Sequence, residues 1–264
     1  MAIHETAILD PGAELADGVD VGPYAVIGAG VRIGAGCRIG PHAHLEGPLD
    51  MGEDCVVGTS SVIGLAPQTV GDDGPGGATR IGVRNVFREF SQVHRSRYAD
   101  KATVIGARNY FMAGAHVAHD CVLADDIVMV NNTALAGHVE VASGAFFGGG
   151  AMIHQFVRIG TLAMVGGYAG LANDAPPYSM TQGIRPAVIA GLNMVGLRRA
   201  GVSTATRRAL KAAYAVIFRT EGPMEDRLAS LCHDETPEVR HLVEFMRTSE
   251  RGVLRMARGG SEGE

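Results

Sequence analysis

The sequence predicts a solenoid of short stacked strands followed by a helical C-terminal domain. The main observation is a period of six residues. Between Ile3 and Leu171, 26 of the 29 positions at this spacing hold a large apolar side chain, in a chain that is 46% hydrophobic. A strict period of this length indicates a stacked repeat, in which each unit packs on its neighbours. The second observation is a change of composition near residue 192, where Gly becomes rare and Ala, Leu, Arg and Glu become frequent.

Each six-residue unit is expected to hold one short strand and one corner, because six fits neither the helical period of 3.6 nor the strand period of 2. The residue after the large apolar one is often Gly, which suits a corner with close backbone approach. A small residue such as Ala25 or Ala163 lies four positions after the large one. One large and one small inward side chain per unit is what a narrow core can hold.

The units Ile27-Gly-Ala-Gly-Val-Arg and Ile33-Gly-Ala-Gly-Cys-Arg resemble the hexapeptide-repeat family. This resemblance implies a left-handed parallel β-helix of triangular cross-section, with three units per turn and about ten turns. Residues 18 positions apart then stack on the same face. The predicted fold class is therefore mainly β, with residues 1–190 forming the left-handed β-helix and residues 191–264 forming the helical domain.

Two segments interrupt the repeat. Residues 65–79 are rich in Gly, Pro and Asp and are expected to leave the coil as a loop, and the polar residues 95–101 are expected to bulge from it. After each of these two segments the six-residue period resumes in register. In the C-terminal part, Ser203 is a candidate helix N-cap, and Pro223 and Pro237 are typical of helix starts, so three or four helices are predicted.

Composition narrows the classes of partner. The net charge is −5 and no basic run occurs, so a nucleic-acid partner is not expected. No signal peptide is visible, and no apolar run approaches the roughly 18 residues of a transmembrane span. The four cysteines lack CxxC spacing and are expected to be reduced thiols in a cytoplasmic protein. A thin coil has much surface for its volume, so association is expected, and the family resemblance implies a homotrimer.

Four of the ten histidines are expected on or beside one face of the coil: His116, His119, His138 and His154. The units of this face begin at Ile63, Ile81, Ala99, Val117, Leu135 and Ile153. His138 follows Asp120 by 18 positions and should lie directly over it. A histidine beside a carboxylate can act as a general base near neutral pH.

Two other interpretations of these histidines are open. One is that they are solvated or lie in a subunit interface. The other is a metal site, because zinc takes three or four such ligands. Hexapeptide proteins of the γ-carbonic anhydrase type bind zinc through a His-x4-His pair, whereas this chain has only His116-x2-His119. No metal site is therefore predicted.

Three central segments carry a more specific pattern: Ala115-His-Val-Ala-His-Asp-Cys121, Asn131-Asn-Thr-Ala-Leu-Ala-Gly-His-Val139 and Gly148-Gly-Gly-Ala-Met-Ile-His-Gln-Phe156. They resemble the acyl-ACP:UDP-N-acetylglucosamine O-acyltransferase family of lipid A synthesis, and the similarity extends over nearly the whole chain. It implies an enzyme that transfers an (R)-3-hydroxyacyl chain from acyl carrier protein to the 3-hydroxyl of UDP-N-acetylglucosamine, the first step of lipid A synthesis. It implies no cofactor beyond the phosphopantetheine that carries the acyl group.

The resemblance also implies roles for single residues. His119 matches the general base, Asp120 the residue that orients it, and the N–H of Gly137 the oxyanion donor. Residues that match the substrate cleft between subunits are His116, His138, His154 and Gln155. Asn193 matches a contact to the sugar nucleotide, Arg199 a basic residue near phosphate or phosphopantetheine, and Gly167 the position that limits acyl-chain length.

Three short elements depart from the family pattern. An expected Asp-x-Lys aligns with Thr69 and Gly71, an expected Asn-x-Glu is Asn193-Met-Val195, and an expected His-Arg-Gly-Thr is His94-Arg-Ser-Arg97. These elements concern sugar recognition, so other acceptors stay open. The alternatives are a 3-amino sugar nucleotide, a related N-acyltransferase, a CoA-dependent acetyltransferase, and a non-catalytic or metal-binding hexapeptide protein.

Overall fold

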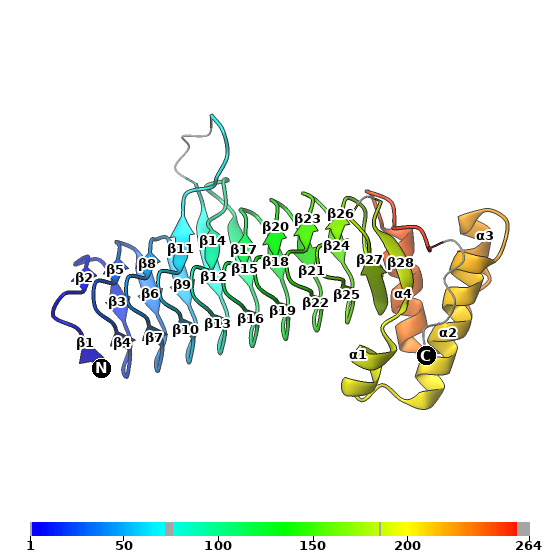
Figure 1. The fold of residues 1–264 in the computed structure, drawn as a ribbon, viewed down its shortest axis with the longest axis horizontal. Helices are drawn as coiled ribbons and strands as arrows, with labels where there is room; N and C mark the ends of the chain where they lie inside the picture. Colours follow the sequence, from blue (N-terminus) through cyan, green and yellow to red (C-terminus); the bar gives the residue numbers. More distant parts are fainter. Residues whose placement is uncertain (1, 72–75, 185, 258–264) are drawn as a thin grey trace.

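The chain winds into a three-sided coil of short parallel strands, and the described residues at its C-terminal end form four helices (Figure 1). This computed structural model describes residues 2–71, 76–184 and 186–257. The coil is a left-handed parallel β-helix, as predicted from the resemblance. Up to β24, each turn contributes one strand to each of three sheets, because each six-residue unit makes one strand and one corner.

The first sheet consists of β1 (Ala2–Ile3), β4 (Asp20–Val21), β7 (Arg38–Ile39), β10 (Val56–Val57), β13 (Val86–Phe87), β16 (Tyr110–Phe111), β19 (Val128–Met129), β22 (Phe146–Phe147), β25 (Met164–Val165), β27 (Ser179–Gln182) and β28 (Val188–Leu192). The second sheet consists of β2 (Ile8–Leu9), β5 (Val26–Ile27), β8 (His44–Leu45), β11 (Val62–Leu65), β14 (Gln92–His94), β17 (His116–Val117), β20 (Ala134–Leu135), β23 (Met152–Ile153) and β26 (Gly170–Leu171). The third sheet consists of β3 (Glu14–Leu15), β6 (Val31–Ile33), β9 (Leu49–Met51), β12 (Ala78–Ile81), β15 (Ala102–Ile105), β18 (Val122–Leu123), β21 (Glu140–Val141) and β24 (Arg158–Ile159).

Neighbouring strands of a sheet pair in parallel at an offset of 18 residues, as in β17 and β20, where His116 pairs with Ala134. From Val21 onward the large apolar residues of the repeat are buried in the core, where the rings of Phe87 and Phe111 stack with centroids 4.8 Å apart. The predicted stacking of residues 18 positions apart is therefore confirmed. Among the strands of the described residues, only the last pair, β27 and β28, is antiparallel.

Two insertions change this offset. Val62 pairs with Gln92, 30 positions later, and Val86 pairs with Tyr110, 24 positions later. The coil therefore ejects twelve residues between β11 and β12, seen as the projecting loop in Figure 1, and six residues between β14 and β15.

The prediction that six units share the face of the histidines was wrong for two of them. Ile81 lies in β12 of the third sheet, and Ala99 lies in the second insertion. The two insertions together equal one full turn, so Val117 returns to the second sheet that holds Ile63. Leu135 and Ile153 follow it there, and the three turns that carry the histidines keep the expected face.

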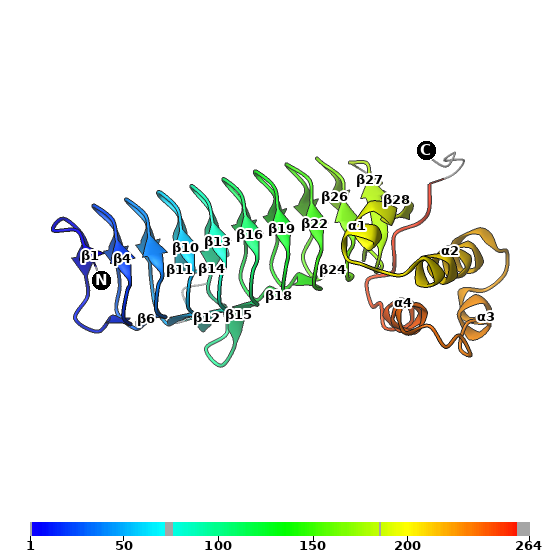
Figure 2. The ribbon, with the colours of Figure 1, turned by 90° about the horizontal axis from the view of Figure 1, so that it is seen from below.

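The C-terminal part forms α1 (Met194–Arg199), α2 (Thr204–Arg219), α3 (Met224–Ala229) and α4 (Pro237–Arg247). Ser203 caps α2 by accepting a hydrogen bond from the N–H of Thr206, as its sequence position predicts. The helices lie at the end of the coil that carries β27 and β28 (Figure 2). The hydroxyl of Tyr214 in α2 donates to the carbonyl of Pro177 at 2.6 Å and so links the helices to the last turn of the coil. Among the described residues, no helix has the length and apolarity to cross a membrane.

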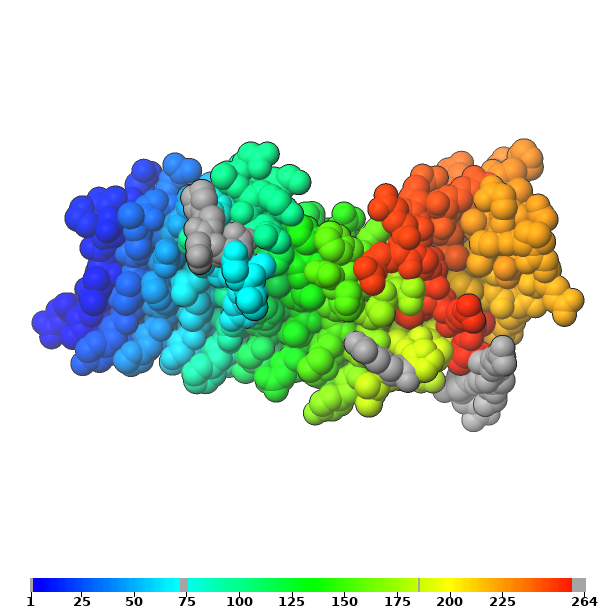
Figure 3. Space-filling model, turned by 90° about the horizontal axis from the view of Figure 1, so that it is seen from above, coloured from blue at the N-terminus to red at the C-terminus, as the bar shows by residue number. Residues whose placement is uncertain are grey.

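The predicted domain boundary at residue 190 falls inside β28, just before α1. Of the predicted loop 65–79, residues 66–71 and 76–77 lie outside the coil, and residues 72–75 are not among those described. In Figure 3 the outline of the molecule is indented over the middle turns, drawn in green, between the 95–101 insertion and the C-terminal helices.

Candidate active site

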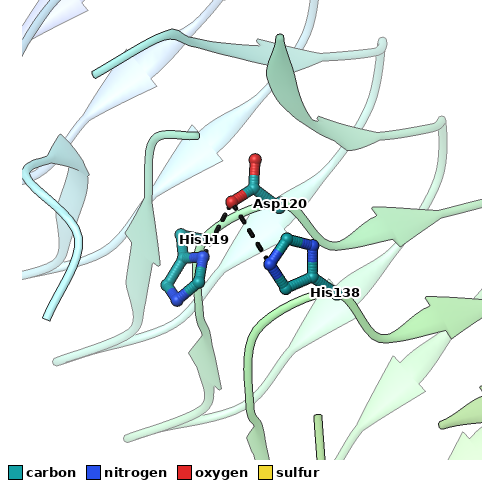
Figure 4. A group of neighbouring side chains, drawn as sticks. All are labelled: His119, Asp120 and His138. Atoms are coloured by element: carbon teal, nitrogen blue, oxygen red, sulfur yellow. Dashed lines mark hydrogen bonds and ion pairs between the residues drawn. The ribbon is translucent and has the colours of Figure 1, made fainter. Parts of the chain in front are cut away.

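The corner between β17 and β18 brings a histidine and a carboxylate together. His119 Nδ1 lies 2.8 Å from Asp120 Oδ2, and the two side chains are 14% and 5% exposed (Figure 4). Adjacent residues can meet in this way because Asp120 has a left-handed backbone, with φ of 60°. An ionised carboxylate only accepts hydrogen bonds, so Nδ1 donates and Nε2 keeps its lone pair.

The Asp120 carboxylate is held by several donors. The hydroxyl of Ser96 donates to Oδ1, and the N–H of Arg97 lies 3.4 Å from Oδ2. Burial by itself raises the pKa of this carboxyl group, but the hydrogen bonds from Ser96 and His119 outweigh it and hold the pKa below its usual value. Asp120 is therefore ionised at neutral pH. The sequence singled out Ser96 only as part of His94-Arg-Ser-Arg97 and did not place it beside Asp120, because the period does not describe the path of an insertion.

His138 occupies the equivalent corner one turn further, with φ of 62°. Its Nε2 lies 3.8 Å from Asp120 Oδ2, and its ring meets that of His119 edge-on at 5.3 Å (Figure 4). Its other face stacks on Phe156 at 4.5 Å. The position of His138 over Asp120 is confirmed. Burial lowers the pKa of His138, so the ring is neutral at pH 7.

Gly137 lies against the edge of the His119 ring that carries Nε2. A Cβ atom at Gly137 would lie 2.6 Å from Cε1 and 2.8 Å from Nε2 of His119, so no side chain fits there without displacing the imidazole. Within the described part of the chain, no acceptor takes the N–H of Gly137. A free backbone donor thus lies beside a nitrogen that can accept a proton.

Three other predicted residues lie near this corner. His116 in β17 is 5.1 Å from the ring of the buried His94, and burial lowers its pKa to about 4. His94 was not identified from the sequence as a site residue. It lies beside the site, and its Nδ1 is 2.8 Å from the carbonyl of Ala66 at the base of the first insertion. His154 and Gln155 follow β23, one turn beyond His138, and both are exposed.

A shallow groove of about 380 Å³ begins at His154 and crosses the second sheet toward Tyr168. Its remaining walls are formed by Gly150, Met152, Ile153, Gly170, Leu171, Ala172 and Ile184. At the corner beside it, Gly167 stacks on Gly149: a Cβ atom at Gly167 would meet the Gly149 carbonyl oxygen at 3.4 Å. The groove is mainly apolar and open along its length, which suits an alkyl chain.

Asn193 and Arg199 lie elsewhere in the chain. Asn193 caps α1, with Oδ1 accepting from the N–H of Gly196 and Nδ2 donating to the carbonyl of Leu162, both at 2.9 Å. Leu162 is at the corner between the third and first sheets, whereas His119 is at the corner between the second and third. A single chain therefore does not bring Asn193 or Arg199 to the histidine cluster.

The ligand atoms of His119, Asp120 and His138 all lie within 4.8 Å of one another, so two nitrogens and one carboxylate could hold a metal ion. Zinc bound here would have to replace the hydrogen bond between His119 and Asp120, because zinc binds such atoms at about 2 Å. The donor set and this hydrogen bond fit a base paired with a carboxylate better than a metal site.

Known proteins resemble this chain over nearly its full length. An acyl-[acyl-carrier-protein]–UDP-N-acetylglucosamine O-acyltransferase of Herminiimonas arsenicoxydans is 42% identical, over 96% of this chain and 99% of the relative. The enzyme of the same name from Thermodesulfovibrio yellowstonii is 41% identical, again over 96% of this chain and 99% of the relative. The chain belongs to this family.

Solved structures agree with this membership. LpxA from Acinetobacter baumannii and the UDP-N-acetylglucosamine O-acyltransferase from Moraxella catarrhalis each superpose with a TM-score of 0.92 at 35% identity. Each alignment covers 97% of this chain and 100% of the other. Residues 174–254 match the second domain described for UDP N-acetylglucosamine O-acyltransferases. The family and the fold predicted from the sequence are both confirmed.

Proposed function

We propose that the chain transfers an (R)-3-hydroxyacyl group from acyl carrier protein to the 3-hydroxyl of UDP-N-acetylglucosamine, with His119 as general base. The observation that carries this proposal is the His119–Asp120 pair, which leaves Nε2 free beside the N–H of Gly137. Relatives at about 40% identity are named for this reaction. The relatives named above do not support the alternative acceptors or a non-catalytic protein.

The reaction follows from this geometry. Nε2 of His119 takes the proton of the sugar hydroxyl, whose oxygen attacks the thioester carbonyl. The oxyanion that forms accepts a hydrogen bond from the N–H of Gly137. The intermediate then expels the phosphopantetheine sulfur, and the imidazolium returns its proton to it. The ionised Asp120 carboxylate stabilises the imidazolium and keeps Nδ1 protonated throughout.

The acyl chain is proposed to occupy the groove that begins at His154. His116, His138 and Gln155 line the cleft for the sugar nucleotide in this proposal. Gly167 admits a longer chain than a bulky residue would, because it has no side chain to project beside Gly149 at the edge of the groove.

The remaining residues are proposed to act across a subunit interface. Asn193 and Arg199 cannot reach the histidines of their own chain, and a homotrimer would let a second copy supply them. Residues 192–220 contain no acidic residue, and the basic ones are Arg198, Arg199, Arg207, Arg208, Lys211 and Arg219. This segment suits the phosphate of phosphopantetheine on acyl carrier protein. We place the reaction in the cytoplasm, which fits the buried free thiols of Cys37 and Cys55.

The test is an acyl-transfer assay with purified protein. It offers 3-hydroxyacyl-ACPs of several lengths with UDP-N-acetylglucosamine or its 3-amino analogue. Wild type should acylate UDP-N-acetylglucosamine, and His119→Ala should lose nearly all activity at an unchanged melting temperature. His42→Ala is the matched control, since His42 is another corner histidine, with φ of 56°, whose ring stacks on Tyr24 far from the site. Absence of transfer by wild type, or full activity in His119→Ala, would refute the proposal.

A further inference from the structure

The second insertion places one buried serine against the carboxylate of the site. Ser96 is fully buried, and its N–H donates to the carbonyl of Ala78 at 3.2 Å, which anchors the insertion to the coil. Segments that leave a repeat usually point their polar side chains to solvent. This serine instead stands in an element, His94-Arg-Ser-Arg97, where the sequence departs from the family pattern.

The hydroxyl is one link in a chain of hydrogen bonds. The N–H of Tyr98 donates to Ser96 Oγ at 3.0 Å, and Oγ–H donates to Asp120 Oδ1. The Tyr98 carbonyl also lies 3.1 Å from Oγ, but the single hydroxyl proton goes to the carboxylate because an ionised group is the stronger acceptor. The other carboxylate oxygen, Oδ2, faces His119. The carboxylate therefore cannot rotate without breaking a bond at one of its oxygens.

We propose that Ser96 is a positioning residue for acyl transfer, whose hydroxyl fixes the Asp120 carboxylate so that Oδ2 faces His119 Nδ1 and Nε2 stays free for the substrate. The inference rests on the proposed role of His119 as general base. Ser96 is too buried to touch a substrate, so it acts only through Asp120. The same hydrogen bond stabilises the ionised carboxylate in a place where burial disfavours it.

Other ionisable groups surround this carboxylate and stay in place when Ser96 is changed. They are His119 on the same corner, His138 on the next turn, Arg97 and Lys101 on the insertion, and Cys121 in the core behind it. Burial raises the pKa of Cys121 to about 12, so this thiol stays neutral. A change in pH dependence on removal of the Ser96 hydroxyl is then due to the lost hydrogen bond.

The first test is Ser96→Ala in the acyl-transfer assay. We expect kcat to fall about tenfold, the typical effect of a lost hydrogen bond to a charged group, with KM unchanged for both substrates. The acid limb of the kcat/KM profile should move to higher pH, because a carboxylate with fewer donors makes the His119–Asp120 pair hold its proton more tightly. Ser91→Ala is the matched control. Ser91 is also buried and donates to the Arg88 carbonyl at 2.6 Å, so its loss should leave the pH profile unchanged.

The second test is a double-mutant cycle. If Ser96 acts through Asp120, Ser96→Ala should have no further effect on kcat in an Asp120→Ala background. A wild-type kcat and pH profile in Ser96→Ala, or the same loss with and without Asp120, would overturn the inference. If Ser96→Ala does not fold, Ser96→Cys replaces it, because the thiol is a weak hydrogen-bond donor. In this variant the acid limb of the kcat/KM profile should move to higher pH by less than in Ser96→Ala. An unmoved acid limb would overturn the inference. Inactive wild type would instead refute the proposed function itself.

Discussion

A methyl group added at Gly137 is the sharpest perturbation of the site. The new Cβ atom would lie 2.6 Å from Cε1 of His119, whereas ordinary contacts begin at 3.4 Å. The imidazole must therefore move by about 0.8 Å or turn away, and either motion breaks the 2.8 Å hydrogen bond to Asp120. A misplacement near 1 Å costs about a hundredfold in rate, or about 2.7 kcal/mol.

The backbone should accept this change. Gly137 is third in its six-residue unit and has no left-handed φ, and alanine occupies the same position of earlier units at Ala29 and Ala35. Gly149→Ala is the control for folding, because its Cβ atom would meet its nearest neighbours only at 3.5 Å. Both variants should melt near the wild-type temperature.

The assay is steady-state transfer from 3-hydroxyacyl-ACP to UDP-N-acetylglucosamine. Gly137→Ala should lower kcat about a hundredfold and change KM little, because the loss is in the transition state. A variant with normal kcat would show that His119 does not act from the position seen here. A variant that loses activity only by unfolding would show that the corner needs glycine for the fold.

Three further results are expected. The pKa of His116 is about 4 in the folded chain and 6.5 when unperturbed, so the unfolded chain binds more protons between these two pH values. The free energy of unfolding should therefore fall as the pH drops from 6.5 to about 4. Thermal melts should show a smaller fall in His116→Gln, and an equal fall would contradict the assignment. Gly167→Met should shift the preference toward shorter acyl chains in competition assays, and an unchanged preference would place the chain elsewhere. Phe111→Ala removes a ring stacked on Phe87 and should cost about 3–5 kcal/mol in chemical denaturation, and a loss below about 1 kcal/mol would contradict the rigid core.

Much of the candidate site could be predicted from the spacing of residues along the sequence. Residues 18 positions apart stack because one turn holds three units, and this spacing predicted His138 over Asp120. The same spacing explains why Gly167 stacks on Gly149. The spacing placed Ile81 on the wrong face. An ejected segment whose length is a multiple of six residues keeps the six-residue period, but it moves the residues that follow to another face of the coil. Only strand pairing shows how many residues each insertion removes from the coil.

The sequence by itself determined the repeat, the face of the histidines and the family, because each depends on residue types at fixed spacing. The tertiary structure decided which side chains touch. The left-handed corner at Asp120 turns two neighbouring residues toward each other, and an insertion that no period describes delivers Ser96 to the same carboxylate. Spacing along a chain sets the height and face of a residue in a coil, whereas contact depends on backbone angles and on the path of ejected segments.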